Sequence, residues 1–350
     1  MKRKFCVIFL AVAICVLCSA CNSWMNGEYI SITPREAKPE TYANRVIEVT
    51  SYTQLRNALS NLVRNGAEDG IISISAFNKG TIHFYVDTAI SNVIENTPFG
   101  AYAVEKITYE IGTNRGVSVV ACKIHYRGGY QQPEQIRQLG GAQELSDAIA
   151  DALENFDRNI LVFMEQYEKI EVDKIVAEFA SRYPDKVVEI PTVDVSVYPD
   201  KGAERIVEIS FQYNVDQIQL QQMLVKIEEC FSSVEQQVQG LEKPADVCEQ
   251  LYLCLTERAQ YIDVVSVTPA FNLLVNGEGD KTAFCEVFAR MCNRIGLNCK
   301  TVCGTRNGQE WTWNAVLIQG QYHYIDLIRC MEMEEFHFLS GTLLDAYEAE

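Results

Sequence analysis

The sequence has few basic residues relative to acidic ones. Its 350 residues contain 30 Lys and Arg against 47 Asp and Glu, which gives a formal net charge of −17. Removal of residues 1–20 would take away Lys2, Arg3 and Lys4, leaving 27 basic residues against 47 acidic ones and a net charge of −20. A surface this acidic repels phosphate backbones and anionic lipid headgroups. We therefore expect no nucleic-acid partner, and we attribute the charge to solubility close to a membrane.

The sequence also lacks a metal-type cysteine pattern and a second long apolar run. No apolar run after the N-terminal segment approaches the ~20 residues of a membrane-spanning helix. Nine cysteines follow Cys21: Cys122, Cys230, Cys248, Cys254, Cys285, Cys292, Cys299, Cys303 and Cys330. No two pairs of them have zinc-type spacing, so we predict no metal site and no cofactor. An odd number cannot all pair within the chain, and most lie in apolar periodic segments typical of buried thiols.

The N-terminus has the pattern of an export signal. A cationic "MKRK" precedes a 13-residue apolar core, "FCVIFLAVAICVL", and "CSAC" follows. We therefore predict a signal peptide over residues 1–21, with a lipobox and a lipid on Cys21. The Leu usual three residues before the lipidated cysteine is replaced by Cys18, so cleavage without lipidation stays open. Either way the protein is predicted to be exported, to the outer face of a bacterial cytoplasmic membrane or into the medium.

Residues 22–50 are predicted to form a polar tether, and an internal repeat follows. Residues 52–74 align with residues 142–164 at an offset of 90, which pairs Leu55 with Leu145. Helical spacing, a short apolar strand, helical spacing and two alternating strands occur in the same order twice. The pattern predicts tandem αβαββ modules over 51–130 and 140–214.

A third unit is predicted after the repeat. Residues 215–241 have the spacing of an amphipathic connector helix, and 242–350 form one further domain. Together with the modules, this makes the expected fold class α+β.

One segment of that last domain resembles a known family. Asp280 is placed to cap a helix that begins at Lys281, and Gly296 is placed to end it. Three strands are expected next, "CKTVCGT", "WTWNAVLI" and "YHYIDL". This order resembles the transglutaminase-like superfamily, which has a papain-like α+β core. Matches to the family motif without a gap are Leu274, Gly277, Ala283, Phe284, Phe288, Met291, Gly296 and Leu297, and Trp313, Asn314 and Asp326 match the later strands.

The resemblance implies a catalytic triad that this chain does not keep. In the family a cysteine opens the helix, a histidine on the next strands takes its proton, and an aspartate orients the histidine. The corresponding positions hold Lys281, Trp311 and Asp326. An indole N–H accepts no proton, and a lysine forms no thioester. The resemblance therefore implies the fold and argues against the activity.

Two alternative nucleophiles stay open. Cys285 lies one helical turn beyond Lys281, on nearly the same face. It would serve if the register were shifted by four residues, but it falls where the family has a small buried residue. Lys281 itself could act as an amine nucleophile. The chain's four histidines, His83, His125, His323 and His337, are predicted to be structural.

We predict an exported, lipid-anchored envelope protein whose degenerate transglutaminase-like domain binds or scaffolds. Expected partners are the membrane, through Cys21, and an envelope protein or peptide ligand. The predicted binding residues are Trp311, Trp313, Asn314 and Asp326. The competing prediction is an active cysteine peptidase or transamidase that uses Cys285. A weaker one is a sugar- or peptide-binding protein whose groove survives without the triad.

The lipid anchor can be tested by mass spectrometry of the mature protein. We expect an N-terminal peptide that begins at Cys21 and carries the mass of a lipid, because small residues precede this cysteine. A mature chain that begins at Asn22, or an unmodified Cys21, would remove the anchor.

Overall fold

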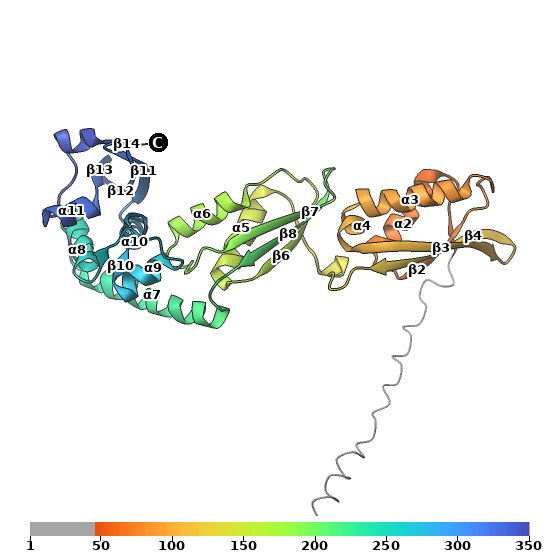
Figure 1. The fold of residues 1–350 in the computed structure, drawn as a ribbon, viewed down its shortest axis with the longest axis horizontal. Helices are drawn as coiled ribbons and strands as arrows, with labels where there is room; N and C mark the ends of the chain where they lie inside the picture. Colours follow the sequence, from red (N-terminus) through yellow and green to blue (C-terminus); the bar gives the residue numbers. More distant parts are fainter. Residues whose placement is uncertain (1–45, 350) are drawn as a thin grey trace, which may run out of the picture.

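The computed structural model describes residues 46–349. The predicted signal peptide, Cys21 and nearly all of the predicted tether lie outside the described residues. The described chain forms three units in a row, with the first repeat module at one end and the C-terminal domain at the other (Figure 1). About 43% of the structure is helix and 27% strand, and both types contribute to every unit, so the α+β prediction is confirmed.

The first module is a four-stranded sheet with helices on one face (Figure 1). Its elements are β1 (Val46–Glu48), α2 (Tyr52–Arg64), β2 (Asp69–Ser73), α3 (Ile82–Asn96), α4 (Pro98–Ala103), β3 (Val104–Asn114) and β4 (Val117–Tyr126). The strand order is β1-β2-β4-β3, in which only the β1–β2 pair is parallel.

The second module repeats this topology. Its elements are β5 (Arg137–Leu139), α5 (Ala142–Asn155), β6 (Asn159–Met164), α6 (Val172–Arg182), β7 (Thr192–Tyr198) and β8 (Arg205–Gln212), and a short 3-10 turn, Pro133–Gln135, precedes them. The strand order β5-β6-β8-β7 matches that of the first module. The starts of α5, β6 and α6 each lie 90 residues after the starts of α2, β2 and α3.

Each module has one strand more than the predicted αβαββ unit. The extra strands β1 and β5 have three residues each and pair in parallel with β2 and β6. Val46–Glu48 was expected in the tether. The structure places these residues in β1, so the first module begins earlier than residue 51. A three-residue strand is too short for an alternation pattern, and its hydrogen bonds depend on a partner more than 20 residues away in the chain.

The C-terminal domain contains the longest helix and a four-stranded antiparallel sheet. Its main helices are α7 (Gln217–Gln237), α8 (Pro244–Thr256), α10 (Lys281–Arg294) and α11 (Leu327–Met333). The sheet order is β13 (Gln321–Ile325), β12 (Gln309–Ile318), β11 (Cys299–Arg306) and β14 (Tyr347–Ala349). Minor elements are β9 (Gln260–Tyr261), α9 (Pro269–Phe271), a π-helical turn (Asn272–Asn276), β10 (Glu278–Gly279) and a 3-10 turn (Gly341–Ala346).

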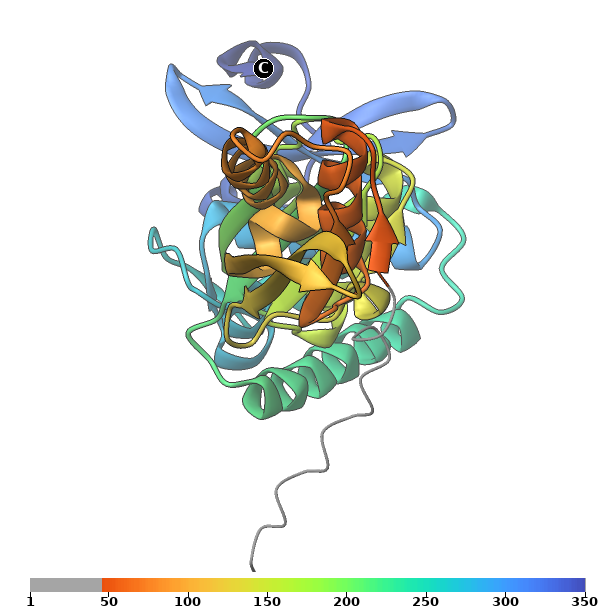
Figure 2. The ribbon, with the colours of Figure 1, turned by 90° about the vertical axis from the view of Figure 1, so that its right-hand side faces the viewer.

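Helix α7, predicted as a connector, packs in a hydrophobic cluster that contains residues of both the second module and this domain. Its buried residues Leu220, Ile227 and Phe231 share one hydrophobic cluster with Phe284 and Phe288 of α10. Figure 2 shows the helix below the other elements of the described chain. The amphipathic pattern predicted the helix correctly, but periodicity alone does not tell which unit covers its apolar face.

The two modules meet through aromatic side chains. The rings of Phe99 in α4 and Phe163 in β6 stack with centroids 5.6 Å apart, and Tyr102 contacts Tyr198 edge-on at 5.7 Å. Such pairs add packing energy beyond the area that they bury.

The second module and the C-terminal domain are joined by a buried carboxylate. Asp185, just after α6, lies 2.8 Å from Nε of Arg290 and 3.2 Å from Nη1 of Arg294, both on α10. The Asp185 side chain is 4% exposed. Arg294 also pairs with Glu228 and Glu235 of α7, at 2.6 Å each, so one guanidinium binds three carboxylates.

Replacing Asp185 tests this junction. Asp185→Ala leaves two partly buried cations without their shared anion, so we expect it to lower the unfolding free energy by about 3–5 kcal/mol. The measurement is urea unfolding followed by tryptophan fluorescence, since Trp311 and Trp313 both report on the C-terminal domain. Asp200→Ala is the control, because Asp200 is exposed and in the same module. Equal stability of the two variants would contradict a structural role for Asp185.

Candidate functional site

The helix that carries the family resemblance begins as predicted. Asp280 Oδ1 accepts a hydrogen bond from the Ala283 N–H at 2.8 Å, and Lys281 is the first residue of α10. Before it, Gly277 has a φ of 79°, and a Cβ there would lie 2.7 Å from the carbonyl oxygen of Arg258. Only glycine fits this position without strain, because the backbone is left-handed and the space is filled.

Trp311 and Asp326 are in direct contact. The Trp311 indole N–H donates to Asp326 Oδ2 at 2.9 Å. Asp326 was expected inside the last strand, and the structure corrects this: β13 ends at Ile325, and Asp326 caps α11 by accepting from the Arg329 N–H at 3.1 Å. Both oxygens of the Asp326 carboxylate therefore accept a hydrogen bond.

Two further side chains complete the environment of Asp326. The Tyr347 hydroxyl donates to Oδ2 at 2.6 Å, and Arg306 Nη1 lies 3.3 Å from the same oxygen. Asp326 is fully buried, and burial together with this carboxylate raises the pKa of Tyr347 above its usual value. Four donors therefore contact this buried carboxylate, three at Oδ2 and one at Oδ1.

The triad-equivalent residues come together in space. Lys281 Nζ lies 5.4 Å from the centroid of the Trp311 ring, and Arg306 Cζ lies 4.9 Å from it. Both distances are within the range of cation–π attraction. Lys281, Trp311 and Asp326 therefore form one chain of contacts, with the indole in the middle.

Cys285 lies in the core rather than in this cluster. It is 1% exposed, and its thiol donates to the Thr312 carbonyl at 3.4 Å. The pKa of the thiol is raised well above its ordinary value, first by burial and then by the negative charge of Asp326. The backbone carbonyl of Cys285 also accepts from the Asn314 side chain at 2.8 Å.

Three of the four residues predicted to bind a ligand are buried. Trp313, Asn314 and Asp326 are 2%, 0% and 0% exposed, and only Trp311 is half-buried. Trp313 packs edge-on against Tyr347 at 5.2 Å. These residues fill the interior beside the triad-equivalent cluster, so the structure offers a ligand no open groove between them.

The four histidines lie apart from Cys285. His83 contacts Tyr109 and His125 contacts Thr108, both in the first module. In the C-terminal domain the His323 ring packs against Phe338, and His337 Nδ1 lies 3.7 Å from the Cys330 sulfur. Burial raises the pKa of Cys330 to about 11, so the thiol in this Cys–His contact is protonated at neutral pH.

Over residues 46–349, all nine cysteines are free thiols, and only Cys303 is exposed. In the same range, no group of three or more His, Cys, Asp or Glu side chains is arranged to hold a metal ion. No helix in this part of the chain is long and apolar enough to cross a membrane.

The sequence prediction missed the partners of Asp326. Arg306 lies at the end of β11 and Tyr347 in the last short strand, 20 and 21 residues from Asp326. No motif marks either residue. The pairing of β11 with both β12 and β14 is what brings them to the carboxylate.

Comparisons with known proteins return structural neighbours only. No family model matches the sequence, and no curated protein matches it. Three similar solved structures are a TGase, a candidate protease from Parabacteroides distasonis and a candidate cysteine protease from Cytophaga hutchinsonii. Their identities are 12%, 7% and 10%, and their TM-scores 0.28, 0.24 and 0.27.

The matches cover 55%, 74% and 46% of this chain and 58%, 40% and 71% of the three neighbours. The chain thus spans less than two thirds of the TGase.

Tyr347→Phe tests the hydrogen bonding of Asp326. The change removes one hydroxyl that donates to a buried carboxylate, so we expect a loss of about 1–2 kcal/mol in the unfolding free energy. Tyr324→Phe is the matched control, since Tyr324 is half-buried in the same sheet and its hydroxyl makes no hydrogen bond within residues 46–349. It should change stability by less than about 0.5 kcal/mol. The measurement is urea unfolding of both variants, and equal losses would argue against the Asp326 cluster.

Proposed function

We propose that this protein is an exported, lipid-anchored envelope protein whose transglutaminase-like domain is catalytically inactive and acts in binding or scaffolding. The observation that carries the proposal is the contact between Trp311 and Asp326. The residue where the family has its base is an indole that donates to the carboxylate, so proton transfer at this position has no acceptor.

The electrostatics of Cys285 support the same conclusion. In a working site an imidazolium and a helix N-terminus stabilise the thiolate. Here Asp326 acts on Cys285 without an intervening imidazole, and its charge raises the thiol pKa instead of supporting a base. Burial adds to this effect, so the thiol is protonated at neutral pH and closed to substrate.

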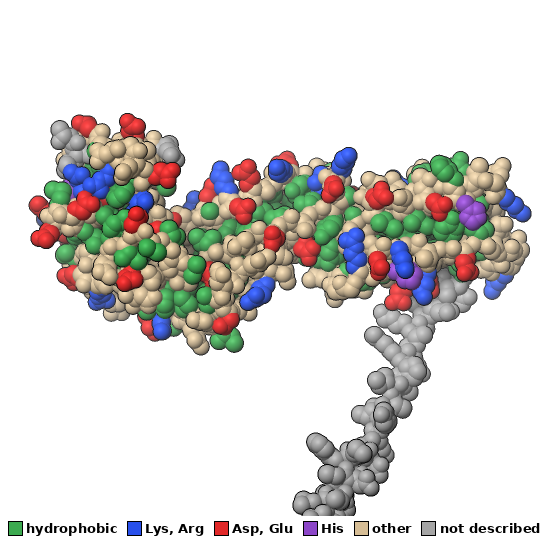
Figure 3. All heavy atoms as spheres, viewed as in Figure 1, with side chains coloured by type: hydrophobic (Ala, Val, Ile, Leu, Met, Phe, Trp, Pro, Cys, Tyr) green, Lys and Arg blue, Asp and Glu red, His purple; other side chains and the backbone are tan. Residues whose placement is uncertain are grey.

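The rest of the chain supports a binding role. Two modules with the same topology extend the molecule away from the C-terminal domain (Figure 1). Acidic and basic side chains are interspersed over the visible face of all three units (Figure 3). Such a surface suits a soluble spacer beside a membrane, and the predicted lipid on Cys21 would hold it there.

The test is an activity and reactivity assay on the purified mature protein. We expect no amine incorporation into glutamine peptides and no peptide hydrolysis by the wild type, Cys285→Ala or Cys303→Ala proteins. Iodoacetamide should label Cys303 in the folded state, because it is exposed, and Cys285 only after denaturation. Peptide mapping of the labelled protein distinguishes the two thiols.

Turnover that disappears in Cys285→Ala but persists in Cys303→Ala would overturn the proposal and favour a cysteine peptidase or transamidase. Rapid labelling of Cys285 in the folded protein would contradict the closed core.

A further inference from the structure

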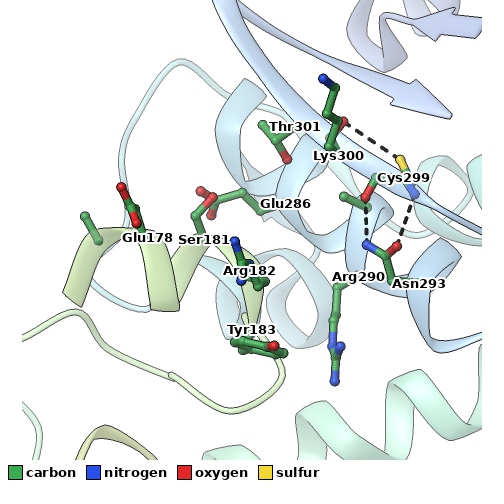
Figure 4. Close-up of a pocket in the computed structure, with 12 residues that line it drawn as sticks. Glu178, Ser181, Arg182, Tyr183, Glu286, Arg290, Asn293, Cys299, Lys300 and Thr301 are labelled. Carbon is green, nitrogen blue, oxygen red and sulfur yellow. Dashed lines mark hydrogen bonds between the residues drawn. The ribbon is translucent and has the colours of Figure 1, made fainter. Parts of the chain in front are cut away.

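A cavity lies between the second module and the C-terminal domain, away from the triad-equivalent cluster. Its volume is about 690 Å³. Helix α6 of the second module forms one wall, and α10 and β11 of the C-terminal domain form the other (Figure 4). This size is within the ~300–1,000 Å³ of small-molecule sites.

The walls of the cavity are held in place by contacts among the lining residues and by an ion pair with Asp185. Arg290 is fixed by its ion pair with Asp185 and by the Tyr183 ring, whose centroid lies 5.0 Å from its guanidinium carbon. Asn293 donates to the Cys299 carbonyl at 2.7 Å and accepts from the Cys299 N–H at 3.1 Å. The cavity is therefore preformed, which lowers the ordering cost of binding.

Both signs of charge line the cavity, and several of the charged groups are unpaired. Within residues 46–349, the exposed side chains of Glu178, Arg182 and Lys300 form no ion pair, and the Lys300 ammonium lies 4.7 Å from the centroid of the Tyr322 ring. Glu286 of α10 faces Ser181 of α6 across the gap (Figure 4). Once Arg290 is neutralised by Asp185, two cations and two carboxylates remain, so the lining has no net charge.

Glu286 is the lining residue that most clearly indicates which ligand group the cavity would bind. Desolvation raises its pKa, and the Ser181 hydroxyl only partly offsets the effect. Glu286 is half-buried, and a carboxylate in such a place without a cation is unfavourable, so an ammonium group beside it would relieve the cost. Arg182 offers the opposite charge on the facing helix, in the fork geometry that suits a carboxylate.

We propose that this cavity binds a short peptide with a free ammonium and a free carboxylate, the ammonium at Glu286 and Glu178 and the carboxylate at Arg182. This assignment rests on the proposed binding function and gives it a site and a ligand class. A neutral sugar would leave these charges unpaired, and a polyphosphate would oppose both carboxylates.

Isothermal titration calorimetry with four tripeptides tests the site: tri-alanine, Ala-Glu-Ala, Ala-Lys-Ala and Ala-Tyr-Ala. We expect at least one to bind saturably to the full mature chain. Acetylation of its N-terminus or amidation of its C-terminus should each weaken binding about tenfold or more, because each removes a charge-assisted hydrogen bond.

Arg182→Met and Glu286→Gln should each weaken binding by a similar factor. The matched controls are Lys174→Met, an exposed cation elsewhere on α6, and Glu249→Gln, an exposed carboxylate on α8. Both controls should bind as the wild type does. Circular dichroism of every variant checks that the fold is kept.

Three results would overturn the inference: no saturable binding of any of the four peptides, equal binding of the capped peptides, or full affinity in both folded cavity variants. None of these results would bear on the proposed inactivity of the triad-equivalent cluster. Turnover that depends on Cys285 would contradict the proposed function and would not bear on the cavity.

Discussion

The arrangement of the second module and the C-terminal domain depends on the buried carboxylate of Asp185. Arg290 and Arg294, on consecutive turns of α10, both pair with Asp185. Arg294 also pairs with two carboxylates of α7. A buried carboxylate is stable only where donors are already placed to pair with it. The ion pairs of Asp185 therefore favour one orientation of the second module relative to the C-terminal domain. The cavity between α6 and α10 exists because that orientation is held.

Helix α10 connects this junction to the triad-equivalent cluster. Its C-terminal half binds Asp185, its centre packs Phe284 and Phe288 into the core, and its first residue lies against Trp311. A thiol at a helix N-terminus is activated by the helix dipole. Here a lysine occupies that end, and the helix supports the structure and lines a cavity.

Asp326 connects several elements of the C-terminal domain. Its carboxylate caps α11 and accepts from an indole, a tyrosine and an arginine. Its negative charge then opposes ionisation of Cys285.

Local sequence patterns were enough to predict most helices and strands and the repetition of the module. The Asp280 cap, the start of α10 and the offset of 90 between the modules follow from cap chemistry and periodicity, which act over a few residues. The strands β1 and β5, the partners of Asp326 and the cavity lined by α6 and α10 depend on tertiary contacts and became visible only in the structure. Asp185 and Arg290 are 105 residues apart in the chain. No local pattern encodes such a contact, because it forms only when separately folded units pack together.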